Sequence, residues 1–129
     1  MNIGLGSKRR TILLVDSDPH ARAVLRNALE AAGFSVGEAA NAREGERTVM
    51  RIRPDAILAD LMMESVNGGT IADRLKEIGS RIPIYIVSNA ADALAGSVGL
   101  HELGVSGVFL KPADTAIVIQ TLKTRLGVS

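Results

Sequence analysis

With 129 residues, the chain fits one domain and is long enough to bury a hydrophobic core. Hydrophobic residues make up 47% of it and aromatic residues only 2%, so the core must consist mainly of Ala, Val, Leu and Ile. The balance of 15 basic against 14 acidic residues argues against a nucleic acid or a membrane surface as the main partner. The absence of cysteine excludes disulfides and thiolate metal sites.

The first residues, MNIGLGSKRR, do not have the layout of a signal peptide, because the basic residues follow the apolar ones. No apolar run approaches the ~20 residues that a membrane span needs. We therefore expect a cytoplasmic protein with a flexible tail over residues 1–9 and a single domain over residues 10–129.

Apolar strands and amphipathic helices alternate along the chain. In chain order, the expected strands cover residues 11–15, 34–39, 55–60, 82–87 and 107–110, and the expected helices cover residues 19–32, 41–51, 67–78, 90–103 and 114–126. Asp18 and Pro19 provide a side-chain cap and a first-turn proline for the first helix, which Gly33 ends.

Later helices have their own signals. Asn41, with Glu44 three residues further on, resembles a capping box for the second helix. Gly96 and Gly99 weaken the fourth helix, since each costs about 1 kcal/mol relative to alanine. Asp114 or Thr115 caps the last helix.

Polar residues follow four of the five expected strands. Strands that are apolar on both faces and alternate with helices predict a parallel sheet with helices on both sides. In such sheets, functional groups gather where the strands end. We therefore expect one edge of the sheet to carry the side chains of Asp16, Asp60, Ser88 and Lys111.

These four side chains suit phosphoryl chemistry. Carboxylates brought together attract a cation, and oxygen ligands without cysteine or a histidine cluster suit Mg²⁺. A lysine beside them is explained if an anion also binds, because lysine and Mg²⁺ together neutralise phosphoryl oxygens. An aspartate can itself accept the phosphoryl group as an aspartyl-phosphate.

The motifs ILLVDSDP, PDAILADLMM, NGG, PIYIVSNA and GVSGVFLKPAD follow one another in a familiar order and spacing. Over about residues 10–126 the chain resembles the receiver domain of bacterial two-component response regulators. The resemblance implies a flavodoxin-like, doubly wound, five-stranded parallel sheet, (βα)5, with helices on both faces. It also implies a partner that donates the phosphoryl group, either a sensor histidine kinase or a phosphotransfer protein.

The resemblance assigns roles by position. Asp60 matches the phospho-acceptor, and Asp16 matches the first of two acids near Mg²⁺. Met62 would offer its backbone carbonyl to the ion, Ser88 matches the switch hydroxyl, and Lys111 matches the lysine that pairs with phosphate. The family often has a cis peptide after this lysine. Members assist their own phosphorylation and dephosphorylation, so we expect a signalling phospho-acceptor and not an enzyme.

Two positions depart from the family pattern. Ser17 stands where the family has its second acid, which usually ligates Mg²⁺, so we expect a weakened metal site unless Asp18 or Glu64 compensates. Val108 stands where the family has an aromatic switch residue. Phe109 follows one position later and should point to the other face of its strand, so the switch is altered as well.

Two alternatives remain open. Ser17 and Val108 favour a pseudo-receiver, a module that binds proteins and never sees phosphate. The segment LLVDSDPH also resembles a haloacid-dehalogenase-like phosphatase, with Asp16 as nucleophile and Asp18 as general acid. That class needs two acids well after its lysine, and here only Asp114 follows Lys111.

The expected partners are proteins. Besides the phosphodonor we expect a downstream protein target and no direct contact with nucleic acid or membrane. The apolar run Ile117–Ile119 is wider than one buried helix stripe, so at least one of its residues should face outward. Such a residue suggests a contact with a partner protein or with a second copy of the chain through the last helix.

Overall fold

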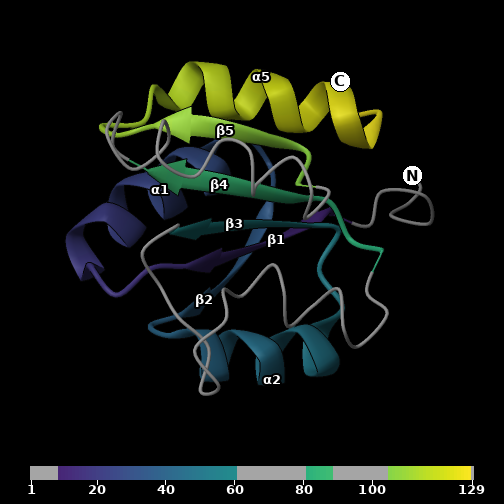
Figure 1. Cartoon of the computed structure of the whole chain (residues 1–129). Coiled ribbons are helices and arrows are strands. Elements are labelled where there is room, and N and C mark those ends of the chain that lie inside the picture. Colours follow the sequence, from purple (N-terminus) through teal and green to yellow (C-terminus); the bar gives the residue numbers. More distant parts are fainter. Residues whose placement is uncertain (1–8, 61–80, 89–104, 129) are drawn as a thin grey trace.

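The computed structural model describes residues 9–60, 81–88 and 105–128 (Figure 1). The strands are β1 (Thr11–Val15), β2 (Ser35–Ala39), β3 (Ala56–Asp60), β4 (Ile84–Ser88) and β5 (Gly107–Leu110). The helices are α1 (Pro19–Ala31), α2 (Ala42–Ile52) and α5 (Thr115–Leu126). The helices expected at residues 67–78 and 90–103, and the tail expected at residues 1–9 except for its last residue, lie outside the described residues.

The five strands form one parallel sheet in the order β2-β1-β3-β4-β5. The chain moves outward from β1 to β2, then returns to the other side of β1 for β3. The strand order therefore reverses between β1 and β3, and in open α/β sheets functional sites lie outside the carboxyl ends of the strands at such a point. The predicted doubly wound, flavodoxin-like sheet is confirmed.

Helices pack on both faces of the sheet, as predicted. Alternate residues of a strand point to opposite faces, so Leu13 and Ile57 lie on the α2 side while Leu14 and Leu58 lie on the α1 and α5 side. In Figure 1, α2 and α5 lie at opposite sides of the stacked strands. Both faces are aliphatic, and the central strands are almost completely buried.

The predicted helix caps are confirmed. The Asp18 side chain accepts a hydrogen bond from the His20 amide at 2.9 Å. Asn41 accepts one from the Glu44 amide at 2.8 Å. Asp114, and not Thr115, caps α5. These caps fix where each helix begins.

The first helix ends as the sequence predicts. Its last turn is followed by Gly33, which has a φ of +98°. This left-handed conformation favours glycine, because a Cβ atom would strain it. The next residue, Phe34, is buried and leads directly into β2.

Candidate phosphoryl-acceptor site

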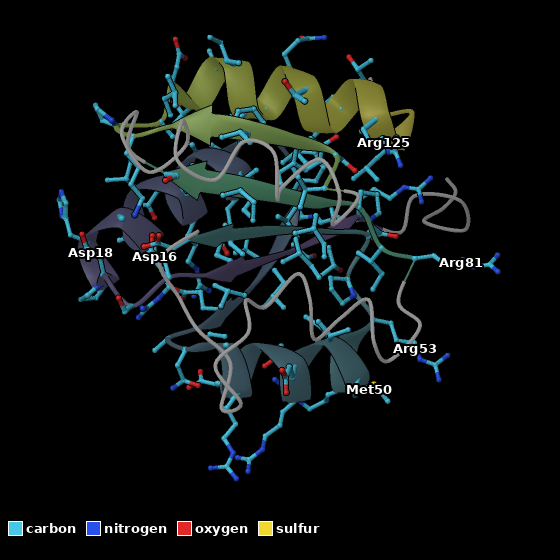
Figure 2. All side chains as sticks on the ribbon, in the orientation of Figure 1. Asp16, Asp18, Met50, Arg53, Arg81 and Arg125 are labelled. Atoms are coloured by element: carbon cyan, nitrogen blue, oxygen red, sulfur yellow. The ribbon has the colours of Figure 1, made fainter. Side chains whose placement is uncertain are left out.

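Asp16 is held at the end of β1 by its neighbours on both sides. Its amide donates to the Ala39 carbonyl at 3.0 Å, which extends the β1–β2 ladder by one residue. Its Oδ1 accepts from the Asp18 amide at 2.8 Å. The residue is only 7% exposed, so the carboxylate lies in a partly dry environment at the edge of the sheet. Figure 2 shows Asp16 and Asp18 together at this edge.

Lys111 joins the two carboxylates that the strands bring together. Its Nζ lies 3.1 Å from Asp16 Oδ2 and 3.1 Å from Asp60 Oδ2. The backbone amide of Lys111 donates to the Ser88 carbonyl at 2.8 Å, which fixes the start of the loop after β5. The Lys111–Pro112 peptide is cis, as the sequence resemblance implies. Three predicted residues from three different strand ends thus form one cluster.

The amine of Lys111 is a permanent cation at neutral pH. Partial burial lowers the pKa of Lys111, but hydrogen bonds and charge interactions with Asp60 and Asp16 outweigh this effect. The pKa of Lys111 is therefore raised above its ordinary value. The cluster carries two negative charges and one positive charge, and this net charge favours a further cation.

Ser88 lies close to this cluster in the sheet. It is the last residue of β4 and is buried, with 1% of its surface exposed. In the β3–β4 pairing, Asp60 stands opposite Val87, the residue before Ser88. The parallel strands therefore end with Asp60 and Ser88 at the same edge.

Ser17 and Asp18 do not add carboxylate oxygens to the cluster. Ser17 is exposed in the turn after β1, and Asp18 is exposed and caps α1. Within residues 9–60, 81–88 and 105–128, no three His, Cys, Asp or Glu side chains form a group that could hold a metal ion. Met62 and Glu64, which the sequence also places near the site, lie outside the described residues.

The two carboxylates of the cluster, Asp16 and Asp60, fit Mg²⁺. This ion is usually held by one or two protein carboxylates and keeps several of its waters. Asp16 and Asp60 both contact the Lys111 amine, so the two carboxylates face the same small cluster. The donor set is hard and purely oxygen, which suits Mg²⁺ better than a softer metal.

Val108 and Phe109 face opposite sides of β5, as predicted. Val108 pairs with Ile86 and is exposed, whereas the partly buried Phe109 packs against the cluster on the α1 and α5 side. The Phe109 ring stacks on Tyr85, with ring centroids 5.4 Å apart and an interplanar angle of 25°. An aromatic ring is therefore present in β5, but it belongs to the core of the opposite face.

A cavity of about 410 Å³ opens beside the cluster, between α1 and the loop after β5. Polar groups line the end of the cavity near the cluster, and apolar side chains line most of the rest. The lining residues are Asp16, Asp18, His20, Ala21, Val24, Leu25, Val87, Lys111, Pro112 and Ala113.

Sequence reasoning missed one contact of the site. Arg22 of α1 donates from Nη1 to the carbonyl of Asp16 and from Nε to Glu38 Oε1, the latter at 3.1 Å. The available signal was Glu38 itself. It is a lone carboxylate in a strand of a covered sheet, and such a group needs a charged partner.

The strand order and the helices on both faces place the chain among the doubly wound, flavodoxin-like α/β proteins. Within this class, the chain belongs to the response regulator receiver domain family, whose model matches residues 12–123. Response regulators serve two-component signalling. No helix within the described part of the chain is long and apolar enough to cross a membrane.

Individual proteins resemble the chain over most of its length. The transcriptional regulatory protein PrrA of Mycobacterium leprae is 29% identical over 98% of this chain and 53% of its own length. The phosphate regulon transcriptional regulatory protein PhoB of Pseudomonas aeruginosa is 32% identical over 91% of this chain and 52% of its own length. The chain thus spans about half the length of these relatives. The crystal structure of a response regulator from Desulfuromonas acetoxidans matches with a TM-score of 0.83 at 25% identity. The match covers 92% of this chain and 97% of that protein.

Proposed function

We propose that the chain is a receiver domain, spanning residues 10–129, that accepts a phosphoryl group on Asp60. The observation that carries this proposal is the position of Lys111, whose amine is 3.1 Å from a carboxylate oxygen of both Asp60 and Asp16. A cation fixed between two carboxylates at a strand edge is well placed to bind phosphoryl oxygens. In this role the chain is a signalling phospho-acceptor and not an enzyme with a separate substrate.

The proposed donor is the phosphohistidine of a sensor histidine kinase or of a phosphotransfer protein. An Asp60 oxygen attacks the phosphorus and forms a P–O bond, while the P–N bond breaks and its electron pair returns to the imidazole. Lys111 neutralises part of the charge on the phosphoryl oxygens, and the Ser88 hydroxyl donates a hydrogen bond to one of them. The cavity between α1 and the loop after β5 offers an apolar contact for the donor protein beside Asp16.

Asp16 and Asp60 would hold Mg²⁺, together with the Met62 backbone carbonyl. When bound, the ion supplies charge neutralisation for the phosphoryl oxygens. Ser17 contributes a neutral hydroxyl where a second acid is usual, so the site should bind the ion weakly. The further partners in this proposal are a downstream protein target in the cytoplasm and a second copy of the chain through α5.

Incubation with acetyl phosphate and Mg²⁺ tests the proposal. We expect the intact protein to gain the mass of one phosphoryl group and the Asp60→Asn variant to gain none, because an amide is a far poorer nucleophile of nearly the same shape. Asp18→Asn is a matched control, since asparagine caps helices as well as aspartate does. The control should be labelled like the parent. Full labelling of Asp60→Asn would place the acceptor elsewhere.

A pseudo-receiver is the second candidate. It is favoured by the neutral, exposed Ser17 and by Val108 in place of an aromatic residue. In the same incubation, a pseudo-receiver would show no covalent change in any variant. The phosphatase alternative needs Asp18 as a general acid. We do not retain it, because the Asp18 side chain caps α1 and the family match is to receivers.

A further inference from the structure

We infer that Arg22, held by Glu38, is a positioning residue that fixes Asp16 for cation and phosphoryl binding. The inference rests on the proposed function of the Asp16, Asp60 and Lys111 cluster. Arg22 lies on α1, away from the strand ends, and none of its described contacts is with Asp60 or Lys111.

Arg22 completes the set of bonds that hold Asp16. The Asp16 amide, Oδ1 and Oδ2 bind Ala39, Asp18 and Lys111, respectively. Only the carbonyl remains, and the guanidinium of Arg22 donates to it. This bond fixes the plane of the peptide between Asp16 and Ser17, where the chain turns from β1 toward α1. A charge-assisted donor is about twice as strong as a neutral one.

Glu38 determines where the guanidinium of Arg22 can lie. Arg22 Nε donates to Glu38 Oε1 at 3.1 Å, while Nη1 of the same planar group faces Asp16. Because the guanidinium is a rigid fork, one orientation serves both acceptors. The Arg22 side chain is only 18% exposed, so solvent competes little for these bonds. Strand β2 is thereby linked through α1 to the turn that carries Asp16.

Arg26 provides a matched control within the same helix. It also binds Glu38, and in addition Glu30 at 3.3 Å, but none of its described contacts is with Asp16. Its side chain is 42% exposed. Replacing Arg26 therefore perturbs the same carboxylate and removes the same charge from the same helix, while the bond to the Asp16 carbonyl stays in place.

The charge of Arg22 and its positioning of Asp16 predict opposite effects on the Mg²⁺ affinity when Arg22 is replaced. Arg22 is a cation close to a cation site, so loss of its charge alone would tighten Mg²⁺ binding. Loss of positioning would weaken binding, since removal of a residue that orients a ligand typically costs about tenfold or more in metal affinity. Because Ser17 offers no carboxylate, the Mg²⁺ affinity should depend more strongly on the orientation of Asp16.

The test compares Mg²⁺ affinity by calorimetry in the parent, Arg22→Met, Arg22→Lys and Arg26→Met. We expect the affinity to fall about tenfold in Arg22→Met and at least as much in Arg22→Lys, which keeps the charge but loses the fork. Arg26→Met should stay within about twofold of the parent, as expected for a surface position. Unchanged or tighter Mg²⁺ binding in Arg22→Met would overturn the inference.

Amide exchange provides a second measurement that needs no metal. The Asp18 amide, which donates to Asp16 Oδ1, should exchange about tenfold faster in both Arg22 variants than in Arg26→Met. Equal exchange rates would also overturn the inference. If the parent itself bound no Mg²⁺, the metal part of the proposed function would fail, and the exchange rates alone would decide the role of Arg22.

Discussion

Ser17 is the residue at which this site departs most from a fully acidic one. It is exposed in the turn beside Asp16, so a carboxylate there can be accommodated without displacing core atoms. A unit charge about 4 Å from a cation is worth about 4 kcal/mol per cation charge at an effective dielectric of about 20, before desolvation. A tenfold increase in Mg²⁺ affinity requires only about 1.4 kcal/mol of binding free energy. We therefore expect Ser17→Asp to tighten Mg²⁺ binding about tenfold or more, measured by calorimetry.

The matched control for this change is Ser17→Asn, which adds nearly the same shape without a charge. Its Mg²⁺ affinity should remain close to that of the parent. In EDTA, Ser17→Asp should be less stable than Ser17→Asn by about 0.5–1 kcal/mol, because a further negative charge joins Asp16 and Asp60 at a solvent-exposed position. Equal Mg²⁺ affinity in the two variants would mean that the site already has the carboxylate it needs.

At the scale of elements, Glu38 links β2 to α1 through two arginines. Burial raises the pKa of Glu38, but hydrogen bonds from Arg26 and Arg22 outweigh it and lower the pKa below its ordinary value. A lowered pKa in the folded state means that these ion pairs stabilise the fold above the unfolded pKa of about 4.3. This stabilisation is lost as the pH falls through the folded pKa.

We therefore expect the stability of Glu38→Gln to depend less on pH than that of the parent. At pH 7 the free energy of unfolding, measured in urea, should be about 1 kcal/mol lower for Glu38→Gln than for the parent, since both ion pairs are partly exposed. This difference should shrink toward pH 3. Glu30→Gln is the control, because Glu30 binds only Arg26 among its described contacts and is more exposed. If the pH profiles of parent and Glu38→Gln ran parallel, the ion pairs would contribute nothing.

The elements could be predicted because their signals are local. Asp18 with Pro19, and Asn41 with Glu44, place the starts of two helices within a few residues of sequence. The edge position of Asp60 and Lys111 also follows, because all strands of a parallel sheet end on the same side.

The contact between Arg22 and Asp16 could not be predicted in this way. It depends on how α1 crosses the sheet and on which rotamer Glu38 imposes on the guanidinium. The sequence shows a basic residue one turn into a helix, where exposure to solvent is the usual outcome. Only the packing of α1 against β2 turns that residue inward.

At the scale of the whole molecule, several charged residues of the described chain lie at opposite ends of the strands. Asp16 and Asp18 lie at the edge where the strands end, whereas Arg53, Arg81 and Arg125 lie at the opposite edge (Figure 2). At the edge where the strands end, Asp16, Asp18 and Asp60 outnumber the ammonium group of Lys111. A cation, or a donor protein with basic residues around its phosphohistidine, would be drawn to that edge.

Among the described residues, β5 and α5 carry three exposed large apolar side chains. Val108, Leu110 and Ile117 are among the exposed large apolar residues of the described chain, and Ile117 is 56% exposed beside the buried Val118. The prediction that part of the run Ile117–Ile119 faces outward is thus confirmed. Burying such side chains between two copies would favour association through α5.

We expect the protein to self-associate and Ile117→Lys to weaken this association about tenfold or more, because a charge would be buried in an apolar contact. Sedimentation equilibrium over a range of protein concentrations measures the change. Met50→Lys is the matched control, since Met50 is 69% exposed on α2, on the other face of the sheet, and the substitution adds the same charge. Its association should match that of the parent. A parent that stays monomeric, or equal weakening by both substitutions, would exclude a homodimer through α5.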